Sequence, residues 1–172
     1  MLKLQSNKNV ITSKSAKVLM LKVSKNKNLP FVLRHNRALI LDSVDDSAIV
    51  GFGAVFSKRR EDVGVSGVYY LDEDLEHLDD GDVIRVIPST NYVRAIYRVS
   101  AEANFLLVTE RCNSFCLMCS QPPRKVNDDH LVGELLEAIP LIDRGARELG
   151  ITGGEPTLLG DGFFRLVESI RS

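Results

Sequence analysis

The chain has 172 residues, of which 44% are hydrophobic and 26% charged, the proportions of a soluble globular protein. Its longest apolar run, residues 48–56, is far shorter than the roughly 20 residues of a membrane span. Lysines interrupt every candidate core of a secretory signal. The three cysteines lie close together, which excludes a disulfide framework and indicates a reducing compartment. We therefore expect a cytoplasmic protein with no membrane partner.

The net charge of −1 conceals a strong asymmetry along the chain. Residues 1–37 carry nine Lys or Arg and no Asp or Glu, so the rest of the chain has a net charge of −10. A basic segment could attract nucleic acid or an acidic peptide. These lysines are spread among Val, Leu and Ile without interleaved stacking aromatics, so we expect no nucleic-acid partner.

Residues 1–103 predict a small β-rich module, an open barrel or a sandwich, with no chemistry of its own. Short apolar runs at residues 31–33 and 38–41 flank His35, in a pattern typical of a hairpin turn. Further strands are expected within residues 48–56, 68–71, 83–87 and 92–99. In the last of these, Val93, Ala95, Tyr97 and Val99 face one way and Arg94 and Arg98 the other.

Residues 104–172 show a different pattern, that of a parallel α/β domain. The continuous apolar run at residues 105–109 predicts a strand buried on both faces, and residues 149–152 predict a second. Asp128 or Asp129 is suited to cap a helix between them, and Pro140 should kink that helix. The apolar positions expected on this helix are Leu131, Leu135, Ile139 and Ile142, and those on a second helix are Phe163, Val167 and Ile170. The order predicts the first two βα units of a parallel barrel.

Three cysteines, Cys112, Cys116 and Cys119, form a C-x3-C-x2-C pattern in the loop after the first of these strands. Active sites of α/β barrels are built from loops at this end of the strands. Short spacers let one folded loop supply three thiolates to a [4Fe–4S] cluster, each binding one iron. Without a fourth cysteine, one iron stays open to a non-protein ligand, which is typical of a catalytic rather than a structural metal site.

Other interpretations of the cysteines stay open. They could be small buried hydrophobes, although a polar loop beside Pro122 and Pro123 is an unusual place for these. With His130 they could form a Cys3His zinc site, although zinc usually takes its ligands as two spaced pairs. The alternative function is therefore a non-catalytic iron–sulfur or zinc protein whose N-terminal module binds a peptide.

The motif Gly-Gly-Glu-Pro at residues 153–156 follows the second predicted strand. Two glycines let a backbone approach a ligand closely, and a glutamate is an anionic acceptor for an ammonium group. Taken with the cysteine pattern after the first strand, residues 105–172 resemble the radical S-adenosylmethionine (SAM) superfamily. The fold that this resemblance implies is the beginning of a partial (β/α) barrel.

The resemblance also implies roles for individual residues. Gly153, Gly154 and Glu155 would contact the amino group of SAM, whose amino nitrogen and carboxylate chelate the fourth iron. Thr157 would support this loop. Met118 stands where family members commonly carry an aromatic residue near the adenine, so an apolar contact is implied there but ring stacking is not.

Residues 105–123, FLLVTERCNSFCLMCSQPP, and the later stretch LGITGGEPTLLG are similar to the radical SAM maturases of the His-Xaa-Ser system. The resemblance extends back through GDVIRV at residues 81–86. It implies an enzyme that forms a 5′-deoxyadenosyl radical from SAM to modify a peptide carrying His-Xaa-Ser repeats. It further implies a second radical SAM protein as a partner and an electron donor such as flavodoxin or ferredoxin.

The length of the second part limits what this chain does alone. Only 68 residues follow Asn104, whereas an eight-unit barrel takes about 250. We expect the chain to be the N-terminal fragment of a longer enzyme. Such a fragment would lack most of the pocket wall and would not turn over by itself.

Overall fold

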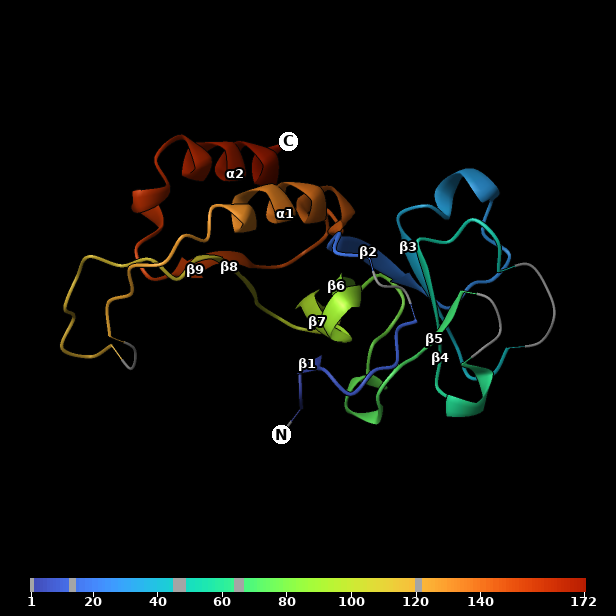
Figure 1. The fold of residues 1–172 in the computed structure, drawn as a ribbon. Coiled ribbons are helices and arrows are strands. Elements are labelled where there is room, and N and C mark those ends of the chain that lie inside the picture. Colours follow the sequence, from blue (N-terminus) through green and yellow to red (C-terminus); the bar gives the residue numbers. More distant parts are fainter. Residues whose placement is uncertain (1, 13–14, 45–48, 64–66, 120–121) are drawn as a thin grey trace. The chain divides into compact units, whose positions relative to one another are not determined.

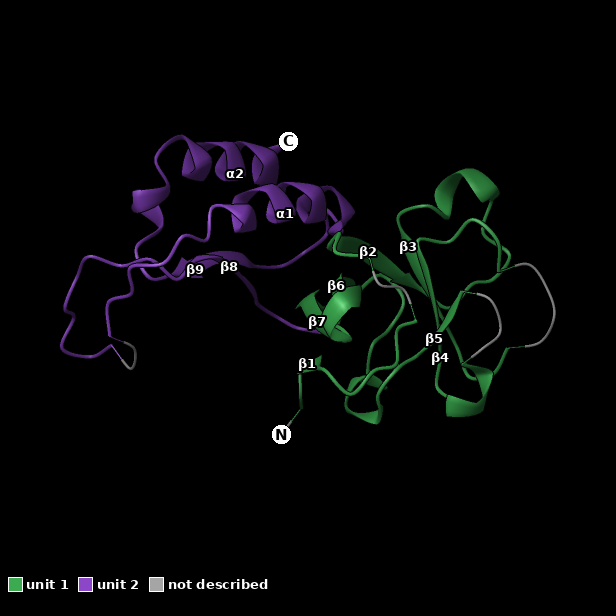
Figure 2. Cartoon of the chain, in the orientation of Figure 1, with its two compact units in different colours: residues 1–100 green, residues 101–172 purple. Residues whose placement is uncertain are grey.

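The computed structural model describes residues 2–12, 15–44, 49–63, 67–119 and 122–172. The chain divides into two compact units, residues 1–100 and 101–172, shown in green and purple in Figure 2. The change of pattern in the sequence, between residues 103 and 104, lies near this division. Unit 1 carries a large mixed sheet and unit 2 carries two α-helices, so the chain is mixed α/β (Figure 1).

Unit 1 is built on a seven-stranded sheet. Its strands are β1 (Gln5–Ser6), β2 (Leu19–Ser24), β3 (Arg37–Leu41), β4 (Ala54–Ser57), β5 (Val68–Tyr70), β6 (Val83–Ile87) and β7 (Tyr92–Tyr97). Their order across the sheet is β1-β7-β6-β2-β3-β4-β5. The pairs from β2 through β5 are parallel, and the pairs that join β2, β6, β7 and β1 are antiparallel.

The sheet of unit 1 curls so that its two edges approach each other. Val10, four residues beyond edge strand β1, pairs with Tyr70 of the opposite edge strand β5. Their backbones exchange hydrogen bonds of 3.2 and 2.9 Å. Because four residues extend at most about 14 Å and a bridged pair adds about 5 Å, Ser6 of β1 and Tyr70 of β5 lie within about 20 Å of each other. This curvature fits an open barrel better than a sandwich.

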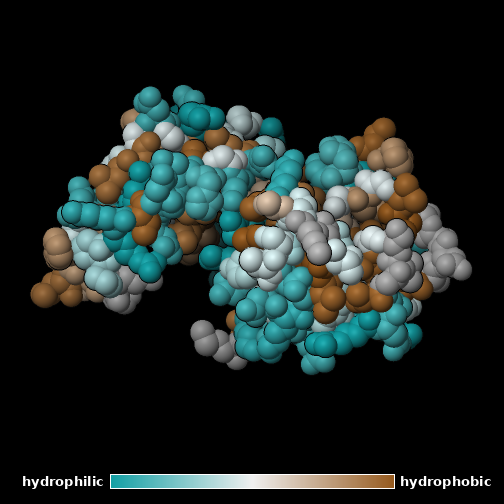
Figure 3. Space-filling model, in the orientation of Figure 1, coloured by the Kyte–Doolittle hydropathy of each residue, from teal (hydrophilic) through white to brown (hydrophobic). Residues whose placement is uncertain are grey.

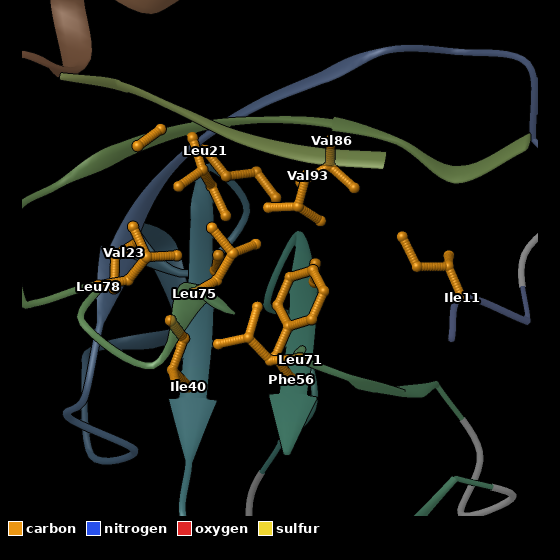
Figure 4. Packing of buried hydrophobic residues seen from close by; sticks show 14 residues of the cluster. Ile11, Leu21, Val23, Ile40, Phe56, Leu71, Leu75, Leu78, Val86 and Val93 are labelled. Carbon is orange, nitrogen blue, oxygen red and sulfur yellow. The ribbon is translucent and has the colours of Figure 1, made fainter. Parts of the chain in front are cut away.

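The inner face of the curled sheet holds the core of unit 1. Fourteen buried hydrophobic residues form one cluster, and Figure 4 labels ten of them. Alternate residues of the strands, such as Leu21 and Val23 of β2, point into it. The acidic segment after β5 adds Leu71, Leu75 and Leu78, which are almost fully buried although seven carboxylates surround them in the sequence.

The hairpin expected around His35 does not form. Phe31–Leu33 is a 3₁₀ helix, and β3 runs parallel to β2, whereas a hairpin would make neighbouring strands antiparallel. The guanidinium of Arg34 holds the segment in this compact turn. Its Nε donates to the carbonyl of Leu29 at 2.8 Å, and its Nη1 donates to the carbonyl of Val50 at 2.9 Å.

Unit 2 contains a two-stranded parallel sheet, β8 (Asn104–Thr109) and β9 (Leu149–Gly153), with helices α1 (His130–Ala138) and α2 (Asp161–Arg171) above it in Figure 1. The strands coincide with the two apolar runs of the sequence. Leu106 and Val108 are each 1% exposed, whereas Phe105 is 59% exposed. Strand β8 is therefore buried on one face within unit 2, and the expectation of burial on both faces was wrong for this part of the chain.

Helix α1 is shorter than expected. It ends at Ala138, and a 3₁₀ turn, Ile139–Leu141, follows. Pro140 lies inside that turn and so ends the helix, because proline has no N–H to continue it. The buried positions are Val132, Leu135 and Ala138, so the inner face begins one residue later than predicted. In α2 Leu166 is buried, and the expected positions beside it are partly buried.

No helix in the part of the chain that the structure describes is both long enough and apolar enough to cross a membrane.

Candidate functional site

A cavity of about 360 Å³ lies at the carboxyl ends of β8 and β9 in unit 2. Its wall contains six residues singled out from the sequence, namely Cys112, Cys116, Cys119, Gly153, Gly154 and Glu155. The rest of the wall is formed by Leu107, Thr109, Glu110, Ser114, Pro122 and Thr152. Carboxyl ends of parallel strands meet at one edge of a sheet, so the two motifs border one space although they are distant in the sequence. The volume lies in the usual range of ligand pockets.

Backbone hydrogen bonds join the Gly-Gly-Glu-Pro motif to the residues directly before the cysteine loop. The N–H of Gly154 donates to the carbonyl of Thr109 at 2.9 Å, and the N–H of Glu155 donates to the carbonyl of Arg111 at 2.7 Å. Cys112 is the next residue along the chain. The turn that carries Glu155 is thus fastened to the residues that begin the cysteine loop.

The two glycines are required by this close approach. A Cβ atom added at Gly153 would overlap the carbonyl oxygen of Thr109. One added at Gly154 would overlap the carbonyl of Arg111 and lie 2.9 Å from the Cβ of Cys112. A side chain at either position would push the backbones apart, because these neighbours are backbone atoms that cannot turn away.

The cysteine loop is closed at its base. The N–H of Cys112 donates to the carbonyl of Arg124 at 3.1 Å, and Arg111 pairs with Arg124 in a parallel bridge. The Arg124 guanidinium also forms an ion pair of 2.5 Å with Glu110. Both ends of the loop are therefore held, and the cysteines lie between them.

Within the loop the thiols are accessible. Cys116 and Cys119 are exposed, Cys112 is half-buried, and none of the three forms a disulfide. The N–H of Cys119 donates to the carbonyl of Cys116 at 3.0 Å, which makes a tight turn between them. Within the described ranges, no three His, Cys, Asp or Glu side chains gather closely enough to form a metal-binding group.

The tip of the cysteine loop is strongly apolar. Phe115, Leu117 and Met118 are each at least 90% exposed, and the loop tip is the brown projection at the lower left of Figure 3. Met118, for which the resemblance implies an adenine contact, is not part of the cavity wall.

The carboxylate of Glu155 is oriented by Thr157. Its Oε1 accepts hydrogen bonds from the Thr157 hydroxyl at 2.6 Å and from the Thr157 N–H at 3.1 Å. The hydroxyl, and then the N–H, hold the pKa of Glu155 below its ordinary value. The group is therefore anionic near neutral pH. Within the described chain its Oε2 accepts no hydrogen bond, so that oxygen remains available to a ligand.

Asp128 has a role that the sequence did not predict. It does not cap α1; its carboxylate is buried and accepts from the Thr109 hydroxyl at 3.0 Å and from the Glu110 N–H at 2.5 Å. Burial alone would raise the pKa of Asp128. The Glu110 N–H, the Thr109 hydroxyl and the Arg111 charge outweigh it and lower that pKa. The available signal was the polar Thr109 at the end of β8, followed by Glu110 and Arg111.

His130, the fourth ligand of the zinc interpretation, is the exposed first residue of α1. It is not part of the cavity wall. The wall instead brings together the cysteines and Glu155, which a zinc site does not require.

Comparison of the chain with protein-family models, with curated proteins and with solved structures finds no match.

Proposed function

We propose that this chain contributes to a radical SAM enzyme that modifies a peptide after translation. Cys112, Cys116 and Cys119 hold a [4Fe–4S] cluster, and Gly153, Gly154 and Glu155 hold SAM beside it. The observation that carries this proposal is the shared cavity wall, in which the two motifs are joined by the hydrogen bonds from Gly154 and Glu155.

The residues of the cavity fit such a cluster in their chemistry. Thiolates are the ligands that iron–sulfur clusters take from proteins, and these three thiols lie in one loop without disulfides. Three ligands leave one iron open, and an open position is what a substrate or cofactor needs. Cys116 and Cys119 are exposed, so their thiols are accessible to a cluster; to bind one, the three thiols must move closer together than they lie here.

The turn at residues 153–155 fits the amino-acid end of SAM. Its glycines present backbone without side chains, which lets a ligand approach. The anionic Glu155, with Oε1 fixed by Thr157, offers Oε2 to an ammonium group as a charge-assisted acceptor. When bound, the cluster and SAM would supply the one-electron chemistry that yields a 5′-deoxyadenosyl radical.

The substrate class and partners of the proposal follow the resemblance seen in the sequence. The substrate is a peptide, the His-Xaa-Ser repeat type being the one that the narrower resemblance favours. A second radical SAM protein and an electron donor such as flavodoxin or ferredoxin complete the system, in the cytoplasm. Met118 contacts the adenine in this proposal, which requires its exposed side chain to turn toward the cavity.

Anaerobic reconstitution tests the metal. The 172-residue chain should take up iron and sulfide, about four of each, and turn brown. Replacement of Cys112, Cys116 or Cys119 by Ala should abolish this uptake. The control is Ser114→Ala, which alters the same wall without removing a thiol and should leave the cluster intact. Stoichiometric zinc without labile sulfide would establish the zinc alternative and reject the proposal.

A further inference from the structure

Asp128 is a buried charged residue, only 6% exposed, that bonds to Thr109 and Glu110 of the cavity wall. Its two carboxylate oxygens lie 3.0 Å from the Thr109 hydroxyl, and Oδ2 accepts the Glu110 N–H at 2.5 Å. The Arg111 Nε lies 3.0 Å from Oδ1, an ion pair at an angle unsuited to a hydrogen bond. One carboxylate thus holds three consecutive residues.

Those three residues support both motifs of the cavity. The carbonyl of Thr109 accepts from Gly154, and the carbonyl of Arg111 accepts from Glu155. The Thr109 hydroxyl also accepts the Arg111 N–H at 3.0 Å, and this bond stabilises the turn formed by residues 109–111. Any rotation of this turn would move Cys112 and the Glu155 turn relative to each other.

An ionised carboxylate is needed at this place because its two oxygens both accept. A buried charge is costly unless partners surround it, and here an N–H, a hydroxyl and a guanidinium do so. An asparagine has nearly the same shape but only one accepting oxygen. In one orientation its NH2 group would face the Glu110 N–H, donor against donor. In the other it would face the Arg111 guanidinium, and in both the attraction between carboxylate and guanidinium would be lost.

We propose that Asp128 is a positioning residue, which fixes the turn formed by residues 109–111 and thereby the relation between Cys112 and Glu155. Its effect on cofactors rests on the proposed function, but its effect on the backbone does not. The neighbouring Asp129 provides a matched control. Asp129 also pairs with Arg111, over 2.6 Å to Nη2, but its side chain is 69% exposed.

The first experiment measures amide hydrogen exchange in the full chain without metal, for the original sequence, Asp128→Asn and Asp129→Asn. In Asp128→Asn the amides of Gly154 and Glu155 should exchange roughly tenfold faster, while those of α2 keep their rate. Asp129→Asn should leave both sets within about twofold, because exposed ion pairs contribute little. Unchanged exchange at Gly154 and Glu155, or equal acceleration throughout unit 2, would overturn the proposal.

Thr109→Val provides a second variant if Asp128→Asn does not fold. It keeps the shape of the side chain but removes one donor to the carboxylate and the acceptor of the Arg111 N–H, so the same two amides should again exchange faster.

The second experiment measures SAM affinity in chains reconstituted with iron and sulfide. Asp128→Asn should bind SAM about tenfold more weakly with unchanged iron content, and Asp129→Asn should bind it normally. Unchanged SAM affinity in a variant with faster exchange would overturn the positioning role. If the original chain itself takes up no cluster, the proposed function fails, and the exchange experiment still decides the role of Asp128 in the turn.

Discussion

The N–H of Glu155 donates to the carbonyl of Arg111 over 2.7 Å, and this bond joins the second motif of the chain to the first. The order of the predicted strands places both motifs at one edge of a sheet, but the local sequence does not show this bond. Their meeting follows from the parallel pairing of β8 and β9, in which Thr109 lies opposite Gly153 at the carboxyl edge. A carboxylate is thereby held beside a loop of thiols.

Gly154→Ala tests the close approach at this bond. The added methyl group would overlap the carbonyl of Arg111, so the Glu155 turn must move away and unit 2 should lose about 1–3 kcal/mol of stability. Gly133→Ala, within α1, is the matched control. A Cβ added at Gly133 would meet no atom within 4 Å, so this substitution should stabilise the helix by up to about 1 kcal/mol. Denaturant unfolding followed by helix signal measures both variants. Equal stabilities for the two would contradict the tight contact.

Glu155→Gln tests the acceptor for SAM. The change keeps the shape and removes the negative charge, so the reconstituted chain should bind SAM about tenfold more weakly or worse. Cluster content should not change, because no cysteine is altered. Glu137→Gln, on the exposed surface of α1, is the control for loss of one negative charge. Normal SAM affinity in Glu155→Gln with an intact cluster would show that this carboxylate has another role.

The strands and helices of unit 2 were predictable because each has a recognisable pattern of apolar residues in its own sequence. Residues 105–109 and 149–152 are short apolar runs, and the helices have apolar residues at intervals of three and four. Asp128 and Asp129 were both candidate caps because an Asp before a helix usually caps it; Asp129 takes the N-cap position, without a side-chain capping bond, and Asp128 does not cap. Its side chain bonds to β8 instead, and that long-range contact leaves no periodic signal in the sequence.

Unit 1 was harder to predict because its strands pair over long distances. Short apolar runs around a polar turn are compatible with a hairpin or with a parallel pair, and the sequence around His35 favoured the hairpin. The deciding contacts are those of Arg34 with the carbonyls of Leu29 and Val50. Arg98, the residue after β7, likewise lies 4.0 Å from the buried carboxylate of Asp82, which is distant in the sequence.

Asn9→Ala tests how unit 1 closes its edges. Asn9 is 2% exposed; its Nδ2 donates to the carbonyls of Ser6 and Asn91, and its Oδ1 accepts the N–H of Asp72 at 2.9 Å. Loss of the amide removes the hydrogen bonds to three backbone groups, those of the buried Ser6 and Asp72 and of the half-buried Asn91, so unit 1 should lose about 2 kcal/mol. Exposed Asn28→Ala should change stability by less than about 0.5 kcal/mol. Thermal unfolding of the two variants provides the measurement, and equal midpoints would contradict this role.

The pH dependence of unit 2 tests the charge of Asp128. Burial would raise the pKa of this carboxyl, but the Glu110 N–H, the Thr109 hydroxyl and the Arg111 charge lower it overall. A carboxyl whose pKa is lower in the folded state stabilises that state above its unfolded pKa of about 3.9, and this contribution disappears as pH falls through the folded pKa. The stability difference between the original chain and Asp128→Asn should therefore stay constant from about pH 7 to about pH 5 and shrink below about pH 4.

Denaturant unfolding at a series of pH values gives this difference directly. The subtraction removes the contributions of Asp42, Asp74 and Asp79, whose pKa values are lowered by hydrogen bonds from Lys58, Lys3 and Lys25, because these carboxyls are present in both chains. Around Asp128 the other titratable groups are Glu110 and Asp129, each paired with an arginine. A difference that persists undiminished in acid would mean that Asp128 acts through its shape and not through its charge. A difference that shrinks would support a carboxylate that is ionised at neutral pH and holds the turn at residues 109–111 beside the cysteine loop.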